Sequence, residues 1–95
     1  MVIPMARPLT PLPTPQPSGA LTPVLLGQFI RAKRTQSGLR IDDAAALLGV
    51  AKDTLSKLER GHSGVQLGTL LQVLNGLGIA LKVEPWTAGG DDDWV

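Results

Sequence analysis

The chain has 95 residues and no cysteine. This length suits one small domain, and the absence of cysteine excludes a disulfide framework and a cysteine-based zinc site. The net charge is only +1, but it is unevenly distributed: residues 1–61 carry eight Lys/Arg against four Asp/Glu, whereas residues 62–95 carry one against four. The basic N-terminal part favours a surface that binds nucleic acid, and the acidic C-terminal part favours a different contact.

Several function classes find no support in the composition. Only three residues are aromatic, which argues against an RNA-binding platform of stacked rings. No apolar run approaches the ~20 residues of a membrane helix, and no signal-peptide core is present, so we expect a cytoplasmic protein without membrane contact. The sequence has no glycine-rich phosphate loop, and His62, its only histidine, has no acidic partner at a recognisable spacing. We therefore expect neither an enzyme nor a cofactor or metal site.

Residues 1–20 hold six of the eight prolines. Proline lacks an amide donor and disfavours helix in the preceding residue, so this leader is expected to be extended and largely disordered. Pro8 to Pro11 formally match a PxxP ligand pattern, but a flexible leader is the simpler interpretation.

Four helices are expected between residues 21 and 78. The first begins near Thr22 and Pro23, which suit a cap and a first turn, and ends at Gly38. Its buried stripe is expected to be Leu26, Ile30 and the stem of Lys33. The second helix spans about 41–48 and presents Ala44, Ala45 and Leu48 inward.

The third helix spans about 52–60 and is expected to bury Leu55 and Leu58. Its other face carries Lys52, Asp53, Ser56 and Lys57. The fourth spans about 67–77, with five leucines on one stripe (Leu67, Leu70, Leu71, Leu74 and Leu77). Between the second and third helices, the short glycine-containing turn Leu48-Gly49-Val50 is typical of a helix-turn-helix, whose second helix enters the DNA major groove.

After the fourth helix the apolar residues alternate, which predicts a strand over residues 79–86. A lone strand leaves its backbone groups unsatisfied. We therefore expect it to pair with the same strand of a second subunit about a two-fold axis, through Ile79, Leu81, Val83 and Trp86. The remaining residues, 87–95, are expected to form a flexible acidic tail.

Residues 26–79 resemble the Cro/repressor-like helix-turn-helix family, also called the XRE family. The matching positions are Leu26-Gly27, Ile30-Arg31, Arg34, Gly38-Leu39, Ala45, Leu48-Gly49-Val50, Thr54, Ser56, Leu58-Glu59-Arg60-Gly61, Leu67, Thr69-Leu70-Leu71 and Leu77-Gly78. This resemblance implies an all-α domain of four to five helices that binds a palindromic operator in double-stranded DNA. The expected strand, the flanking leader and the tail are similar to HipB-type antitoxins, which dimerise through such a strand and partner HipA-like kinase toxins.

Two positions depart from the family pattern. Many members begin the second helix with Thr-Gln, where the glutamine contacts DNA, but Arg40-Ile41 stand there in this chain. Either Arg40 takes over as a phosphate contact, or no residue replaces the glutamine. Ala51 replaces the usual serine cap of the third helix, which removes an interaction of about 1 kcal/mol.

The resemblance also assigns roles to individual residues. The DNA-binding candidates are Arg40, Lys52, Asp53, Thr54, Ser56, Lys57 and His62. For Asp53, a carboxylate that phosphates would repel, a structural role at the start of the helix is slightly favoured over base reading. For His62, an exposed loop residue is favoured over a contact with the DNA backbone. Family members pair the positions of Arg34 and Glu59 across two helices, so we expect an ion pair there. Trp94, an apolar ring beside three aspartates, is the candidate partner-binding residue.

Three functional hypotheses follow. The first is a homodimeric repressor that is also the antitoxin of a HipBA-like operon, regulates that operon and binds a HipA-like kinase. The second is a stand-alone phage-like or restriction–modification controller repressor without a toxin partner. The third is a protein-interaction module that no longer reads DNA; the departures at Ile41 and Ala51 support it, and seven Lys/Arg between residues 31 and 60 count against it.

Overall fold

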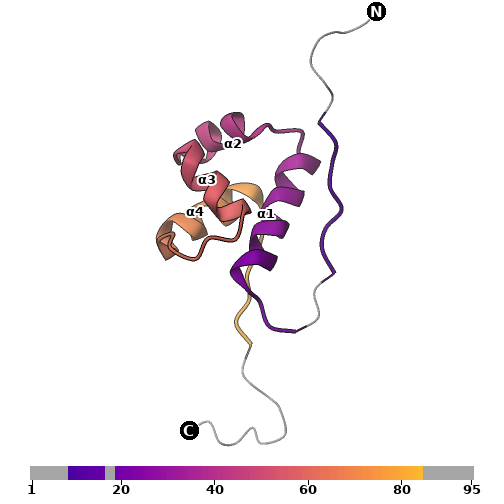
Figure 1. Ribbon diagram of the computed structural model, residues 1–95, viewed down its shortest axis with the longest axis vertical. Coiled ribbons are helices and arrows are strands. Elements are labelled where there is room, and N and C mark those ends of the chain that lie inside the picture. The colour runs from indigo at the N-terminus through magenta and orange to yellow at the C-terminus, as the bar shows by residue number, and fades with distance from the viewer. Residues whose placement is uncertain (1–8, 17–18, 85–95) are drawn as a thin grey trace, which may run out of the picture.

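The computed structural model describes residues 9–16 and 19–84, and the helices within them form a small all-helical domain (Figure 1). Helix α1 spans Pro23–Gln36, α2 spans Ile41–Leu48, α3 spans Lys52–Glu59 and α4 spans Leu67–Leu77. These bounds agree with the expected helices to within a residue or two. The all-helical helix-turn-helix fold is therefore confirmed.

Local signals in the sequence explain where the helices begin and end. The Thr22 hydroxyl accepts a 3.0 Å hydrogen bond from the Leu25 amide, and Pro23 occupies the first turn of α1, where no amide donor is needed. Helix α2 ends at Gly49, whose φ of +74° is a left-handed conformation that favours glycine. The Val50 amide then donates back to the Ala45 carbonyl at 3.0 Å, and the chain turns into α3.

The core lies where the four helices meet. Its fully buried large side chains are Ile30 of α1, Leu55 of α3, and Val73 and Leu74 of α4. Alanines fill the α2 side, because Ala44 and Ala45 are also buried and let neighbouring helices approach closely. Burying each large apolar side chain contributes roughly 1.5–3 kcal/mol, so this cluster fixes how α3 sits on the domain.

The structure corrects two expected stripes. Lys33 is exposed, and the charged residue that α1 buries is its neighbour Arg34. On α4, Leu67 and Leu71 are 67% and 42% exposed. The buried face of α4 includes Val73, which was not in the expected stripe, so the helix is rotated away from the position that leucines alone indicate.

Residues 9–16 of the proline-rich leader run extended beside α1 (Figure 1). The Leu12 backbone amide donates to the Thr35 hydroxyl at 3.0 Å, and Nε2 of the Gln36 side chain donates to the Leu12 carbonyl at 2.7 Å. Thr35 is buried, although it lies outside the core cluster. The extended conformation was expected for this segment, whereas its hydrogen bonds to α1 were not.

Residues 79–84 contain neither helix nor strand. Ile79 packs against the core, whereas Leu81 and Val83 are exposed. The expected strand needs a second chain to pair with, so both the strand and the pairing stay predictions, and Trp86 lies outside the described residues. No helix in the described ranges is long and apolar enough to cross a membrane.

Candidate nucleic-acid interface

Helix α3 presents one face to the core and the other to solvent. Leu55 and Leu58 are buried, while Lys52, Asp53 and Lys57 are exposed. This division follows from the helical repeat, which places residues three or four apart on one face. The structure thus brings three predicted DNA-binding residues together on the exposed surface of one short helix.

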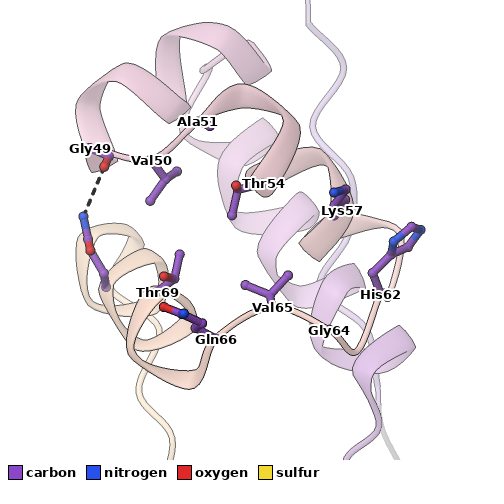
Figure 2. A pocket seen from close by; sticks show the side chains of 11 residues that line it. Gly49, Val50, Ala51, Thr54, Lys57, His62, Gly64, Val65, Gln66 and Thr69 are labelled. Carbon is purple, nitrogen blue, oxygen red and sulfur yellow. Dashed lines mark hydrogen bonds between the residues drawn. The ribbon is translucent and has the colours of Figure 1, made fainter.

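A groove of about 530 Å³ runs along one side of α3, between that helix and α4 (Figure 2). Thr54 and Lys57 line it from α3, His62 from the following loop, and Thr69 from α4. Its lining therefore combines a lysine and a histidine with hydroxyl groups that donate hydrogen bonds. Three of the predicted DNA-binding residues, Thr54, Lys57 and His62, share this groove.

A second cleft of about 510 Å³ lies on the other side of α3, where it faces α1 and α2. Ser56 and Arg60 line it from the α3 side, Arg31 from α1, and Arg40 from the residue that precedes α2. The predicted residues Arg40 and Ser56 thus meet here, apart from the groove that holds Lys57. Arginine guanidinium groups of this kind recognise phosphate oxygens bidentately.

The two hollows give the exposed face of α3 a specific electrostatic setting. Lys57 lines the groove on one side of α3. The cleft on the other side is lined by Arg31, Arg40 and Arg60, together with the carboxylates of Asp42 and Glu59. The helix also carries Lys52. Double-stranded DNA presents a matching pattern, because a major groove about 12 Å wide lies between two phosphate backbones. The arrangement can therefore place α3 against base edges while the flanking cations contact phosphates.

A buried ion pair fixes the C-terminal end of α3 to α1. Arg34 Nε donates to Glu59 Oε2 at 2.6 Å and Nη2 donates to Oε1 at 2.9 Å, and the two side chains are only 8% and 6% exposed. Arg34 Nη1 also donates to the Leu39 carbonyl at 2.9 Å. The structure thus joins the two residues expected to pair, in the bidentate geometry that gives such pairs their directionality.

A second ion pair on α3 is exposed. Lys57 Nζ lies 3.2 Å from Asp53 Oδ2, and the two side chains are 47% and 72% exposed. Exposed pairs four residues apart in a helix contribute only about 0.3–0.5 kcal/mol. Asp53 also stands in the first turn, where its charge complements the helix dipole.

The two departures from the family pattern have visible structural consequences. Ala51 precedes α3 and supplies no side-chain cap, as its residue type requires. Ile41 is partly buried and packs against the core, so this position serves packing in place of a polar DNA contact. Arg40 precedes α2 in an extended conformation at the edge of the arginine-lined cleft.

Sequence reasoning missed several residues of the two hollows. Arg60 lies four residues after Ser56, a spacing that places both on one helix side, and this signal was available. Gln66, Thr69 and Gln72 line the groove from the α4 side, and no local pattern indicates this. Trp94 lies outside the described residues. In the described part of the chain, no group of three or more His, Asp or Glu side chains is placed to hold a metal ion.

Comparisons with known proteins agree with this geometry. A family model described as a helix-turn-helix domain matches residues 25–84. The uncharacterized HTH-type transcriptional regulator y4mF of Sinorhizobium fredii is 36% identical over 62 residues, which cover 65% of this chain and 82% of that protein.

Solved structures also share the fold. The restriction-modification controller protein C.AhdI from Aeromonas hydrophila is 33% identical with a TM-score of 0.55, covering 61% of this chain and 88% of that one. A chain of the HipA–HipB–O2–O3 complex is 21% identical with a TM-score of 0.61, covering 70% of this chain and 93% of that one. At 21% identity, the similarity to that complex shows a shared fold and nothing more.

Proposed function

The chain belongs to the helix-turn-helix domain family, in its Cro/repressor-like (XRE) branch, and we propose that it is a transcriptional repressor that binds operator DNA as a dimer. The regulator y4mF supports this class of function, because the alignment covers most of that protein. We propose no catalytic role for the chain.

The observation that carries the proposal is the placement of α3 between two cation-lined hollows. With α3 in the major groove, Lys57 and His62 face one phosphate backbone and Arg31, Arg40 and Arg60 face the other. Lys52, Asp53 and Ser56 then lie nearest the base edges, where lysine donates to guanine and a carboxylate accepts from cytosine. Thr54 contributes a hydroxyl at the edge of the groove.

We propose a dimer because one domain contacts too few base pairs to recognise an operator by itself. A single α3 of eight residues reads a few base pairs, whereas two copies related by a two-fold axis read a palindrome. Residues 79–86 supply the dimer contact, because Leu81 and Val83 are exposed apolar side chains two residues apart in a segment without helix. The half-site centres are then about 34–36 Å apart, or a multiple of that distance.

The finer proposal is that this repressor is an antitoxin that regulates its own HipBA-like operon and binds a HipA-like kinase toxin. It rests on the shared fold of the HipB complexes and on the acidic tail with Trp94. Deletion of Trp94 and Val95 should weaken toxin binding while leaving operator affinity unchanged. Equal loss of both activities would contradict separate binding surfaces.

A restriction–modification controller without a toxin partner is the second candidate. The observation that favours it is the 33% identity to C.AhdI, which exceeds the identity to the HipB complexes. The neighbouring gene distinguishes the two roles: a HipA-like kinase gene supports the antitoxin, and a restriction or modification enzyme gene supports the controller.

Salt dependence tests the DNA-binding proposal. Operator affinity is measured by fluorescence anisotropy at several salt concentrations, for the wild type, for Lys57→Ala and for Lys33→Ala. The slope of log affinity against log salt changes by about 0.9 for each phosphate that the protein no longer neutralises. Lys57→Ala should make the slope shallower and reduce affinity, whereas Lys33, which lines neither hollow, should have no effect. Identical behaviour of the two variants would reject the proposed interface.

A further inference from the structure

We infer that Gln72 of α4 is a positioning residue for DNA recognition, because its side chain holds the turn that sets the direction of α3. The inference rests on the proposed function. Gln72 is exposed and lies 24 residues beyond the end of α2, so no local pattern connects it with the turn.

The contact is a pair of hydrogen bonds from one side-chain amide. Gln72 Nε2 donates to the Leu48 carbonyl at 2.7 Å and to the Gly49 carbonyl at 3.4 Å. In Figure 2, the dashed line that ends at Gly49 marks the longer bond. Because both partners are acceptors, the nitrogen of the amide must face them, and the opposite orientation would set three oxygens together.

These carbonyls belong to the end of α2, where a helix leaves its last acceptors without internal partners. The Ala45 carbonyl accepts from Val50, and the Ala46 carbonyl accepts from Gly49. The Leu48 carbonyl is instead satisfied from α4. Gln72 thus completes the end of α2 from another helix, and the Leu48 side chain packs over Gly76, one turn further along α4.

The turn matters because α3 has no side-chain cap of its own. Ala51 leaves the first amides of α3 without a hydroxyl acceptor, so apart from the packing of Val50 and Leu55 against the core, no side-chain hydrogen bond from α3 itself orients this end of the helix. The other end is held by Glu59 and its buried partner. Without the Gln72 hydrogen bonds, the N-terminal end of α3 should therefore move while its C-terminal end stays in place.

Such a movement affects base reading more than phosphate binding. Lys52 and Asp53 lie in the first turn of α3, and contacts to base edges depend on their exact placement. Nonspecific binding depends mainly on the number of cations near the phosphates, which is unchanged. The preference for operator over random DNA is thus the quantity that Gln72 controls.

The test compares variants of the full chain. Gln72→Met keeps the length of the side chain but removes the donor, and Asn75→Met makes a similar change at an exposed position on the same helix. Affinities for a selected operator and for a scrambled duplex are measured for both, with thermal unfolding to establish that each variant is folded. We expect Gln72→Met to lower operator affinity roughly fivefold and scrambled-duplex affinity less than twofold, the former being what loss of about 1 kcal/mol produces.

A second substitution separates positioning from direct contact with DNA. Ala51→Ser gives α3 a cap, so adding it to Gln72→Met should restore part of the operator preference. If Gln72 touched DNA directly, a cap at the turn would restore nothing. An unchanged operator preference in Gln72→Met, or the absence of any rescue by Ala51→Ser, would overturn the inference.

Amide hydrogen exchange of the free protein tests whether Gln72 holds the turn without any measurement of DNA binding. Gln72→Met should accelerate exchange at Val50 and Leu55, whose amides donate to Ala45 and Ala51 around the turn, but not at Leu26 of α1. If the wild type shows no operator preference, the proposed function fails, and exchange still decides whether Gln72 holds the turn. Unaltered exchange at Val50 and Leu55 would show that the Gln72 hydrogen bonds do not hold the turn.

Discussion

The two ends of α3 are held in different ways. At its C-terminal end, Glu59 forms a bidentate and nearly buried ion pair with Arg34, and the Leu58 carbonyl approaches Gly27 so closely that an added Cβ would collide with it. At its N-terminal end, Ala51 provides no cap, and the turn is tied to α4 by the exposed amide of Gln72. The ion pair at one end is thus buried, whereas the side-chain hydrogen bond at the other end is exposed.

This difference separates stability from orientation. Breaking a buried ion pair leaves an uncompensated charge and costs about 3–5 kcal/mol. Losing an exposed hydrogen bond between neutral groups costs about 0.5–1.5 kcal/mol. We therefore expect changes at the C-terminal end to affect folding, and changes at the N-terminal end to affect chiefly how α3 meets DNA.

The largest expected effect is at the buried pair. Glu59→Ala should lower the free energy of unfolding by about 3–5 kcal/mol, because Arg34 remains buried without a carboxylate. Urea unfolding followed by circular dichroism measures this cost. The control is Asp53→Ala, which removes an exposed ion pair and a charge that complements the helix dipole and should cost about 1 kcal/mol or less. If Glu59→Ala does not fold, Glu59→Gln, which retains the shape, gives the measurable comparison. Equal costs at Glu59 and Asp53 would contradict the account.

The next effect concerns the approach of α1 to α3. Gly27→Ala should destabilise the domain by about 1–3 kcal/mol, because the new methyl group meets backbone atoms of Leu58 and Glu59 that cannot rotate away. Gly68→Ala is the matched control, as its added Cβ meets nothing within 4 Å on α4. That control should gain about 0.5–1 kcal/mol from helix propensity. A similar gain at Gly27 would show that the two helices are not in close contact.

A smaller effect, of opposite sign, is expected at the N-terminal end. Ala51→Ser should stabilise the protein by about 1 kcal/mol, because residue 51 already has the extended conformation of a helix cap and lacks only the hydroxyl. Thermal unfolding measures the gain, and Ala46→Ser, at an exposed position within α2, should lose a few tenths of a kcal/mol. No gain at position 51 would mean that the first amides of α3 already have partners.

The smallest effect is expected at the contact between α1 and the leader. Thr35→Val removes the acceptor of the Leu12 amide and should cost about 1 kcal/mol or less. The same substitution in a chain without residues 1–16 should cost less, because that bond is then absent, and the difference isolates the contribution of the leader. Equal costs in both chains would show that the leader adds nothing to stability.

The fold was largely predictable because its signals are local. Thr22 with Pro23, the turn at Gly49 and the leucines of α3 each mark an element through neighbouring residues, and the structure has helices at those places. The rotation of α4 was not predictable, because leucines stand on both its buried and its exposed faces. Only the packing of the folded domain decides that Val73 is buried and Leu71 is exposed.

The candidate site divides in the same manner. The helical repeat of α3 predicts that its lysines lie on the exposed face, as they do in the structure. The Arg34–Glu59 contact agrees with what the family resemblance implies. Gln72 and the α4 side of the groove could not be inferred, because they reach α3 through tertiary contacts between residues more than 20 positions apart. Hydrogen bonds from exposed polar side chains to a distant backbone leave no periodic signal in a sequence.

A hydroxyl-radical footprint on the DNA preceding its own gene tests the central claim most directly. With α3 in the major groove and cations on both sides, the wild type should protect the backbones that flank two half-sites, with centres about 34–36 Å apart or at a multiple of that distance. Lys57→Ala should weaken the protection on one flank of each half-site more than on the other. A wild-type protein that protects no DNA at low salt, or a single unsymmetrical patch, would contradict the account.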